Sequence, residues 1–221
     1  MEGCHEVTGW FKHTARQGCR ALRKTNFKRL YKMIRDNING VELVFETAEG
    51  IFSPLYLDKG TLAMLSLVSF EHGDKVLDLG CGYGLVGIYA AKLIGENGNG
   101  NIYMSDVDEK CVELSGINAG INKLEGVNII HSDGFNNIRE KDFSLILSNP
   151  PYNSDFAVAK HFIEKGFNRL AIGGRFYMVT KRKDWYKNKF TAVFGGVKIY
   201  ETEGYFIFCA EKRGTQYANK K

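Results

Sequence analysis

Short apolar runs alternate with longer segments of helical spacing between residues 75 and 194, and this alternation limits the chain to few architectures. The apolar runs are "KVLDL", "NIYMS", "VNIIH", "FSLIL" and "GRFYMVT". Each has the length and composition of a buried strand, and the segments between them fit amphipathic helices. The last segment, "VKIYETEGYFIFCAEK", reads as two strands joined at Glu203-Gly204. We therefore expect an α/β fold with a doubly wound, mostly parallel sheet, to which this closing hairpin adds an antiparallel strand.

Positive charge is concentrated near the N-terminus. Residues 10–35 hold nine of the 30 lysines and arginines and none of the 25 acidic residues, so the remainder of the chain is net negative although the whole carries +5. Like charges repel, so such a cluster indicates contact with a polyanion, while a solvated helix face is the alternative. The candidate RNA contacts within it are Arg16, Arg20, Arg23, Lys24, Lys28 and Arg29.

The same N-terminal stretch has helical periodicity. Phe27, Leu30, Tyr31 and Ile34 fall at helical spacing, which predicts a helix over residues 20–36. The next segment, "GVELVFET", alternates apolar and polar residues as a strand does, and "LDKGTLAMLSLVSF" predicts an apolar helix. We expect two parts, a basic and partly helical arm over residues 1–39 and one globular domain over residues 40–221.

Several classes of protein are disfavoured by the composition. No apolar run is long enough to span a bilayer, and "MEGCHEVTGW" lacks the apolar core of a signal peptide. No membrane partner is therefore expected. The five cysteines are odd in number and scattered, which predicts a reduced, cytoplasmic protein. A metal site is not expected, because the spacing of the possible zinc ligands matches no common zinc finger. Those possible ligands are Cys4, His5, His13 and Cys19.

A glycine-rich loop joins the first strand of the alternation to its helix. In "VLDLGCGYGLVG", Gly80, Gly82, Gly84 and Gly87 allow a ligand to approach the backbone closely. Three of these glycines also satisfy a dinucleotide fingerprint, which is a weak signal when it stands alone. Asp78, just before the loop, would repel a pyrophosphate but would attract the ammonium and sulfonium of S-adenosylmethionine. The pattern therefore favours S-adenosylmethionine over a dinucleotide as the ligand.

Two further acids follow predicted strands. Asp106 ends the second strand, where a carboxylate can accept hydrogen bonds from both ribose hydroxyls. Asp133 ends the third, where it can accept one from the adenine amino group. The alternative for each is a strand-end turn or a helix cap. Asp108 is interpreted as a helix cap, and Cys81, which has no histidine nearby in sequence, as a packing residue.

The fourth strand ends in Asn149-Pro150-Pro151-Tyr152. Two consecutive prolines stiffen the turn and leave carbonyl groups as acceptors. An exocyclic or amide nitrogen that donates to the Asn149 side-chain oxygen and the Pro150 carbonyl would become pyramidal and aim its lone pair at a methyl group. Tyr152 can stack on a planar target. An ordinary strand-ending turn is the alternative, and the neighbouring adenosyl site favours nitrogen methylation.

A basic cluster follows the fifth strand. Lys181 and Arg182 lie in "TKRKDW", at the same predicted edge of the sheet as the glycine loop. They are candidate contacts to RNA phosphates, and an exposed start of a helix is the alternative.

These motifs together resemble the small methyltransferase domain family of class I S-adenosylmethionine-dependent enzymes, over residues 40–213. "DLGCGYG" resembles the cofactor loop of the family, "SDVD", with Asp106 and Val107, resembles its ribose-binding segment, and "NPPY" resembles its amino-methylation motif. The resemblance implies a Rossmann-like sheet of seven strands with one antiparallel strand. It also implies that residues 40–221 form a catalytic domain.

A narrower resemblance connects "GIFSPLYLDKGTLAML" with ribosomal RNA guanine-N2 methyltransferases and their single-domain relatives. Phe52, Ser53, Asp58, Gly60 and Thr61 match the segment that precedes the cofactor loop in those enzymes. The resemblance implies that this segment helps to close the cofactor site.

We therefore expect an N-methyltransferase that acts on an exocyclic base nitrogen of RNA, with ribosomal RNA as its partner. Two alternatives stay open. One is methylation of a glutamine amide, since NPPY also occurs in enzymes that methylate release factors, as it does in DNA adenine methyltransferases. The other is a non-catalytic RNA-binding or assembly factor on the same fold. The sequence does not distinguish guanine from adenine.

Overall fold

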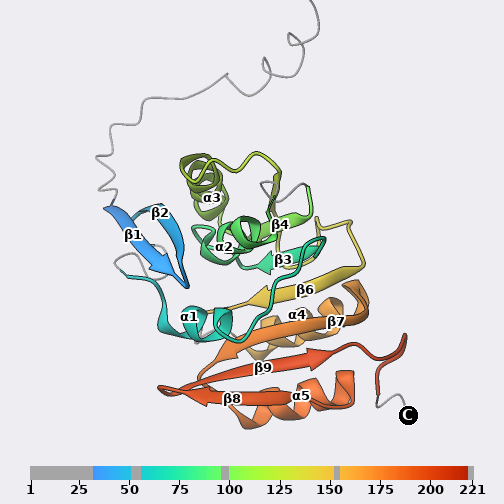
Figure 1. Ribbon diagram of the computed structural model, residues 1–221. Coiled ribbons are helices and arrows are strands. Elements are labelled where there is room, and N and C mark those ends of the chain that lie inside the picture. Colours follow the sequence, from blue (N-terminus) through green and yellow to red (C-terminus); the bar gives the residue numbers. More distant parts are fainter. Residues whose placement is uncertain (1–31, 51–55, 96–99, 152–154, 219–221) are drawn as a thin grey trace, which may run out of the picture.

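From residue 75 onward, strands and helices alternate along the chain in the order that the periodicity predicts (Figure 1). The computed structural model describes residues 32–50, 56–95, 100–151 and 155–218. Within these ranges the main sheet has seven strands in the order β5-β4-β3-β6-β7-β9-β8. These strands are β3 (Val76–Leu79), β4 (Ile102–Asp106), β5 (Val127–His131), β6 (Phe143–Ser148), β7 (Leu170–Thr180), β8 (Lys198–Thr202) and β9 (Tyr205–Glu211).

One strand of the main sheet runs against the others. β3 pairs in parallel with β4 and β6, β4 with β5, and β6 with β7. β9 pairs antiparallel with both β7 and β8, so β8 runs in the same direction as the parallel strands. The predicted α/β fold, with a doubly wound, mostly parallel sheet of seven strands and one antiparallel strand, is confirmed.

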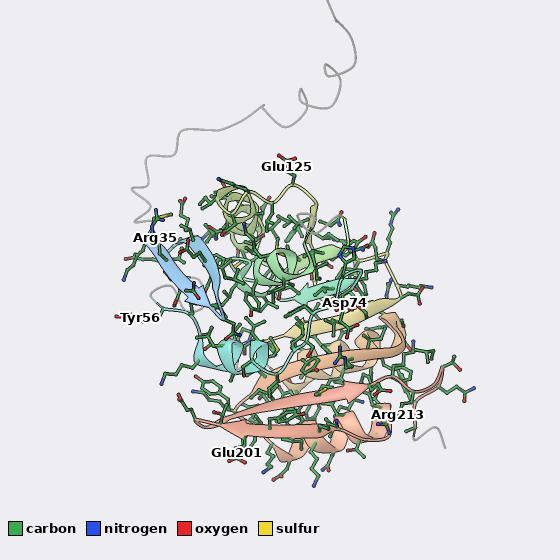
Figure 2. All side chains as sticks on the ribbon, viewed as in Figure 1. Arg35, Tyr56, Asp74, Glu125, Glu201 and Arg213 are labelled. Atoms are coloured by element: carbon green, nitrogen blue, oxygen red, sulfur yellow. The ribbon has the colours of Figure 1, made fainter. Side chains whose placement is uncertain are left out.

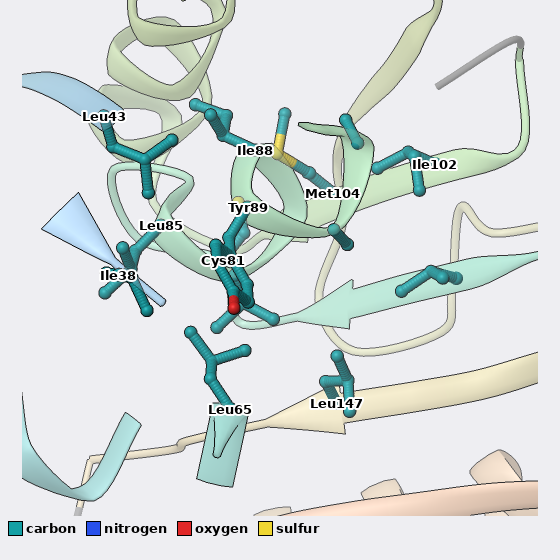
Figure 3. Close-up of a cluster of buried hydrophobic side chains, with 14 of the residues drawn as sticks. Ile38, Leu43, Leu65, Cys81, Leu85, Ile88, Tyr89, Ile102, Met104 and Leu147 are labelled. Atoms are coloured by element: carbon teal, nitrogen blue, oxygen red, sulfur yellow. The ribbon is translucent and has the colours of Figure 1, made fainter. Parts of the chain in front are cut away.

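Two hydrophobic clusters lie on opposite faces of this sheet. Successive side chains of a strand point to opposite faces, and in β6 Leu145 and Leu147 belong to one cluster and Ile146 to the other. The first cluster, shown in Figure 3, packs under α1 (Lys59–Leu65), α2 (Leu85–Ile94) and α3 (Glu109–Ile121). The second packs under α4 (Phe156–Arg169) and α5 (Asp184–Phe194). The sheet is therefore covered by helices on both sides.

A separate hairpin precedes the main sheet, formed by β1 (Lys32–Ile38) and β2 (Val41–Thr47). The predicted helix over residues 20–36 is wrong for its described part, residues 32–36, which form a strand. Asn39 and Gly40 have φ values of 50° and 88°, as a two-residue hairpin turn requires. Ile34 and Ile38, four residues apart in β1, are both buried. A spacing of four residues fits one face of a strand as well as one face of a helix. The division into an arm and a domain stays a prediction, and its boundary falls at this turn.

The hairpin is fastened to α3 by two asparagines one helical turn apart. The Asn118 side-chain oxygen accepts from the Glu46 N–H at 2.6 Å, and its amide nitrogen donates to the Glu46 carbonyl at 2.9 Å. The Asn122 amide nitrogen donates to the Val44 carbonyl at 2.7 Å, and its oxygen accepts from the Val44 N–H at 3.2 Å. Asn118 also donates to the Tyr83 carbonyl at 2.9 Å, which ties the hairpin to the glycine-rich loop.

Most of the exposed side chains of β1 are polar, although Met33 is also exposed, and Arg35 projects into solvent (Figure 2). Exposed Tyr56 lies against the hairpin, with its ring 5.6 Å from the Lys32 ammonium group. In the part of the chain that the structure describes, no helix has the length and apolarity required to cross a membrane.

Candidate active site

The order of the strands places a crevice at the carboxyl ends of β3 and β6. From β3 the chain continues to β4 and β5 on one side, and it then returns to form β6 and β7 on the other. Ligands of doubly wound sheets bind at such a switch point. Buried Ser148 joins the two strands there, because its hydroxyl donates to the Leu79 carbonyl at 2.7 Å.

A cavity of about 430 Å³ opens at this switch point. Its wall is built from the ends of β3, β4, β5 and β6, from the segment around α1, and from α4. The predicted site residues that line it are Asp58, Thr61, Asp78, Gly80, Gly82, Asp106, Val107, Asp133, Asn149, Pro150 and Pro151. The structure therefore gathers residues from five separate sequence motifs into one wall.

The glycine-rich loop is tied to the end of β4. Gly80 and Gly82 have positive φ values of 77° and 56°, which side chains with a Cβ rarely adopt. The Gly80 N–H donates to the Ser105 carbonyl at 2.8 Å. The Gly82 N–H donates to the Asp106 carboxylate at 2.9 Å. The loop therefore presents its backbone to the cavity while its shape is fixed from β4.

Asp106 is held by two backbone N–H groups. One carboxylate oxygen accepts from Gly82, and the other accepts from the Asp108 N–H at 2.9 Å. Each carboxylate oxygen has a second lone-pair site, so the fixed group can still accept from a diol in the cavity. The Asp108 side chain accepts from the Lys110 N–H at 2.9 Å and caps α3, which confirms its interpretation as a helix cap.

Asp78 is buried in the cavity wall, where its carboxylate accepts from the Gly87 N–H at 2.9 Å. Burial raises the pKa of Asp78 to about 7; the hydrogen bond from Gly87 opposes this, and the Asp106 charge adds to it. Gly87 permits this close packing, because a Cβ there would lie 2.4 Å from the Met104 Cγ. A cation bound in the cavity would stabilise the charged form of Asp78.

Another part of the cavity wall is formed by Asn149, Asp58 and Thr61. The Asn149 amide nitrogen donates to the Asp58 carboxylate and to the Thr61 hydroxyl, at 2.7 Å each. Its side-chain oxygen is buried and has no hydrogen-bond partner among the described residues. Leaving a buried acceptor unpaired costs about 1–3 kcal/mol, so such a group in a cavity wall indicates a ligand donor. Pro150 and Pro151 continue the wall, and Tyr152 lies outside the described residues.

Several lining residues were not predicted, among them Ser105, Val158 and Phe162. Ser105 is almost fully buried, and its hydroxyl has no partner among the described residues. It directly precedes Asp106, so its place at a strand end could have indicated it. Val158 and Phe162 of α4 also line the cavity. Their positions depend on how α4 crosses the sheet, and the sequence pattern does not contain that information.

Two predicted glycines lie behind the wall and do not line the cavity. Gly60 is buried in α1, where a Cβ would lie 2.8 Å from both Tyr205 and Val179. Gly84 has a φ of 93° and caps the start of α2. Both allow close packing that shapes the site, and neither offers its backbone to the cavity.

Lys181 and Arg182 follow the end of β7, at the same edge of the sheet but outside the cavity wall. The Arg182 guanidinium lies 4.8 Å from the Phe156 ring centre, and Lys181 lies 5.0 Å from that of Tyr205. The candidate contacts Arg16, Arg20, Arg23, Lys24, Lys28 and Arg29, and the possible zinc ligands Cys4, His5, His13 and Cys19, lie outside the described residues.

Cys81 lies in the loop, where burial raises the pKa of its thiol well above the ordinary value. A buried thiol held in its neutral form is a poor nucleophile. The interpretation of Cys81 as a packing residue therefore fits its environment.

Comparison with known proteins gives a family match over most of the chain. The family model of the methyltransferase small domain matches residues 42–209. Ribosomal RNA small subunit methyltransferase C of Psychromonas ingrahamii is 31% identical over 174 residues, which are 77% of this chain and 48% of that protein. Uncharacterized protein YbxB of Bacillus subtilis is 32% identical over 179 residues, which are 77% of this chain and 87% of that protein. The chain thus spans about half the length of the first relative and most of the second.

Solved structures show the same fold. The T. thermophilus 16S rRNA N2 G1207 methyltransferase (RsmC), in complex with AdoMet and guanosine, superposes with a TM-score of 0.74 and 27% identity. The match covers 83% of this chain and 51% of that chain. TrmN from Thermus thermophilus superposes with a TM-score of 0.58 and 25% identity, over 68% of this chain and 47% of that chain.

Proposed function

Because this chain belongs to the methyltransferase small domain family of S-adenosylmethionine-dependent enzymes, we propose that it methylates an exocyclic base nitrogen of RNA, with ribosomal RNA as the substrate. The observation that carries the proposal is the unpaired, buried side-chain oxygen of Asn149 in the cavity wall. Such an acceptor fits an –NH₂ group that reacts in the cavity. Two relatives support RNA as the substrate, since their names state ribosomal RNA methylation.

The residues of the cavity fit S-adenosylmethionine, which supplies a methyl group on a positively charged sulfur when it is bound. Asp106 would accept from the ribose hydroxyls, and Asp133 from the adenine amino group. Asp78 would stabilise the cationic part of the ligand. The unpaired hydroxyl of Ser105 is a further polar contact, and Val107 offers an apolar one.

Asn149 and Pro150 would prepare the target nitrogen. Its lone pair is delocalised into the base, so the nitrogen is a poor nucleophile. Donation of its two hydrogens to the Asn149 oxygen and the Pro150 carbonyl would make it pyramidal and direct the lone pair at the methyl carbon. Bound S-adenosylmethionine would supply the methyl group, and its sulfur would keep the bonding pair as a neutral thioether. The methylated nitrogen would then lose a proton to water, and until then Asn149 would stabilise its positive charge.

RNA would reach this cavity across a basic surface. Lys181 and Arg182 would contact phosphates beside the cavity, Tyr152 would stack on the base, and the arm would contact phosphates farther away. We place the reaction in the cytoplasm.

Deletion of residues 1–31 should weaken RNA binding and flatten its dependence on salt, because fewer counterions are released. Equal binding by both forms across a salt series would exclude a role for the arm.

A glutamine amide is the second candidate substrate, since it also presents an –NH₂ group to Asn149. Purified full-length protein is incubated with methyl-labelled S-adenosylmethionine and with RNA, DNA and protein fractions, with Asn149→Ala as the control. We expect label in the RNA fraction. Label in a release factor and none in RNA would support the second candidate. Absence of both label and calorimetric ligand binding would indicate a non-catalytic factor.

A further inference from the structure

We propose that Asp58 and Thr61 are positioning residues that orient the Asn149 side chain for methyl transfer. This inference rests on the proposed function, because it explains how Asn149 comes to face the reacting nitrogen. The resemblance of the sequence implied instead that the segment containing Asp58 and Thr61 closes the cofactor site. The contacts in the structure assign them a partner just past the end of β6, Asn149.

One carboxylate oxygen of Asp58 collects three hydrogen bonds at the start of α1. It accepts from the Thr61 N–H at 2.8 Å, from the Thr61 hydroxyl at 3.2 Å and from the Asn149 amide nitrogen at 2.7 Å. Because the Thr61 hydroxyl gives its hydrogen to Asp58, its oxygen is the acceptor for Asn149 at 2.7 Å. The three side chains form a closed network.

This network permits only one orientation of the Asn149 amide. The Asp58 carboxylate oxygen accepts, so the atom of Asn149 that faces it must be the nitrogen. Both amide hydrogens are then used, one by Asp58 and one by Thr61. A rotation of the amide by 180° would place its oxygen against two acceptors. The oxygen is therefore held at the opposite end of the amide, where it is buried without a partner among the described residues.

The network also strengthens the acceptor. An amide that donates to a carboxylate becomes more polarised, and its oxygen gains negative charge. The base of the network is rigid, because α1 packs so closely that Gly60 leaves no room for a Cβ beside Val179 and Tyr205. A reacting group positioned by such a rigid support loses little freedom in the transition state.

The positioning role predicts effects on turnover without effects on cofactor affinity. The test compares Thr61→Val, which removes the hydroxyl at similar size, with Thr61→Ser, which restores it. Thr47→Val is the matched control, since Thr47 is also a fully buried threonine and lies on β2. We expect kcat of Thr61→Val to fall about 10- to 100-fold, with the Kd for S-adenosylmethionine unchanged. Thr61→Ser should recover most of this loss.

Two results would overturn the inference: a wild-type kcat in Thr61→Val, or a loss of kcat matched by an equal loss of cofactor affinity. If thermal unfolding shows that Thr61→Val is not folded, the same measurements are made on Asp58→Asn. Asparagine retains the acceptor for the helix cap but removes the charge, so kcat should fall while the cap survives.

A second measurement does not depend on activity. The side-chain amide signal of Asn149 is recorded by NMR without ligand and assigned by its loss in Asn149→Ala. We expect slow exchange with water in the wild type and in Thr61→Ser, and faster exchange in Thr61→Val. Exchange as fast as that of exposed Asn188 would overturn the inference even if the protein methylates RNA. Slow exchange in a protein without methyl transfer would reject the proposed function and retain the positioning of Asn149.

Discussion

Two asparagines in this molecule have the same side chain and opposite hydrogen-bonding states. Asn118, at the junction of α3 with the hairpin, accepts from Glu46 N–H and donates to the carbonyls of Glu46 and Tyr83. Asn149, at the junction of β6 with α1, donates to Asp58 and Thr61, but its oxygen has no partner among the described residues. The first junction has its hydrogen bonds satisfied within the protein. The second keeps one acceptor for something else.

This difference separates an asparagine that holds parts of the structure together from one whose oxygen takes part in the proposed reaction. A buried acceptor without a partner reduces stability, so a folded chain has no reason to keep one where packing alone is at stake. In the Asn118 junction the polar groups hold the hairpin and the glycine-rich loop together. In the Asn149 junction they hold one oxygen in the wall of the cavity. Mutation of the two asparagines should therefore damage different properties.

Asn149→Ala should have the largest effect. Removal of a preorganised group that stabilises transition-state charge should lower kcat by about 10²–10³-fold. The free energy of unfolding should change by only about 1 kcal/mol, because water in the cavity can replace the lost donor. Single-turnover methyl transfer and thermal unfolding measure the two quantities. A variant that is strongly destabilised and fully active when folded would reverse the assignment of roles.

Asn118→Ala should damage stability instead. Its removal leaves the N–H and carbonyl of Glu46 and the carbonyl of Tyr83 without their partner, so we expect a loss of about 2–3 kcal/mol in the free energy of unfolding. Methyl transfer by the folded fraction should stay close to the wild-type rate. Denaturant unfolding gives the stability, and Asn122→Ala, which loses the hydrogen bonds to Val44, should be destabilised in the same way. If Asn118→Ala lost activity without loss of stability, hydrogen-bond satisfaction would not distinguish the two roles.

Asp78 lies between these cases, since it is buried with a partner and its pKa is about 7. A cationic ligand favours the charged carboxylate, so affinity for S-adenosylmethionine should rise about tenfold per pH unit up to pH 7 and then level off. Calorimetry from pH 5.5 to 8.5 measures this, with Asp78→Asn as the control that removes the dependence. Without ligand, the free energy of unfolding should fall as the pH rises from the ordinary carboxyl pKa to pH 7. In that range Asp78 keeps its proton in the folded chain and loses it in the unfolded chain. A pH-independent affinity would exclude this role of Asp78.

Ser105→Ala should have the smallest effect. Its hydroxyl has no partner among the described residues, so its removal should not lower the free energy of unfolding. Loss of one neutral hydrogen bond to the ligand should raise the Kd for S-adenosylmethionine about threefold to tenfold. Calorimetry and thermal unfolding test both parts. A loss of stability with unchanged affinity would place Ser105 with Asn118, among the residues that hold parts of the structure together.

The sequence predicted most of the sheet and much of the cavity wall. Strand and helix periodicities differ, so the alternation after residue 75 was readable, and the carboxyl ends of parallel strands meet at one edge. That rule brought Asp78, Asp106 and Asn149 together correctly. The sequence did not distinguish Gly60 and Gly84, which only permit close packing, from the glycines that line the cavity.

The remaining features could not be predicted from periodicity. Periodicity predicts a helix where β1 forms, because a spacing of four residues fits both, although Asn39-Gly40 is a hairpin turn signal. The hydrogen bonds from Asn149 reach Asp58, 91 positions away in the chain, and Thr61, 88 positions away. Only the three-dimensional packing of α1 against the sheet creates them.

The most direct test of the account is the chemical position of the transferred methyl group. RNA methylated by the wild-type protein is digested to nucleosides and analysed by mass spectrometry beside RNA treated with Asn149→Ala. We predict a methyl group on an exocyclic amino nitrogen in the wild-type sample and its loss with Asn149→Ala. A methyl group on a ring nitrogen, a carbon or a ribose oxygen, or an unchanged yield with Asn149→Ala, would contradict the role assigned to the Asn149 oxygen.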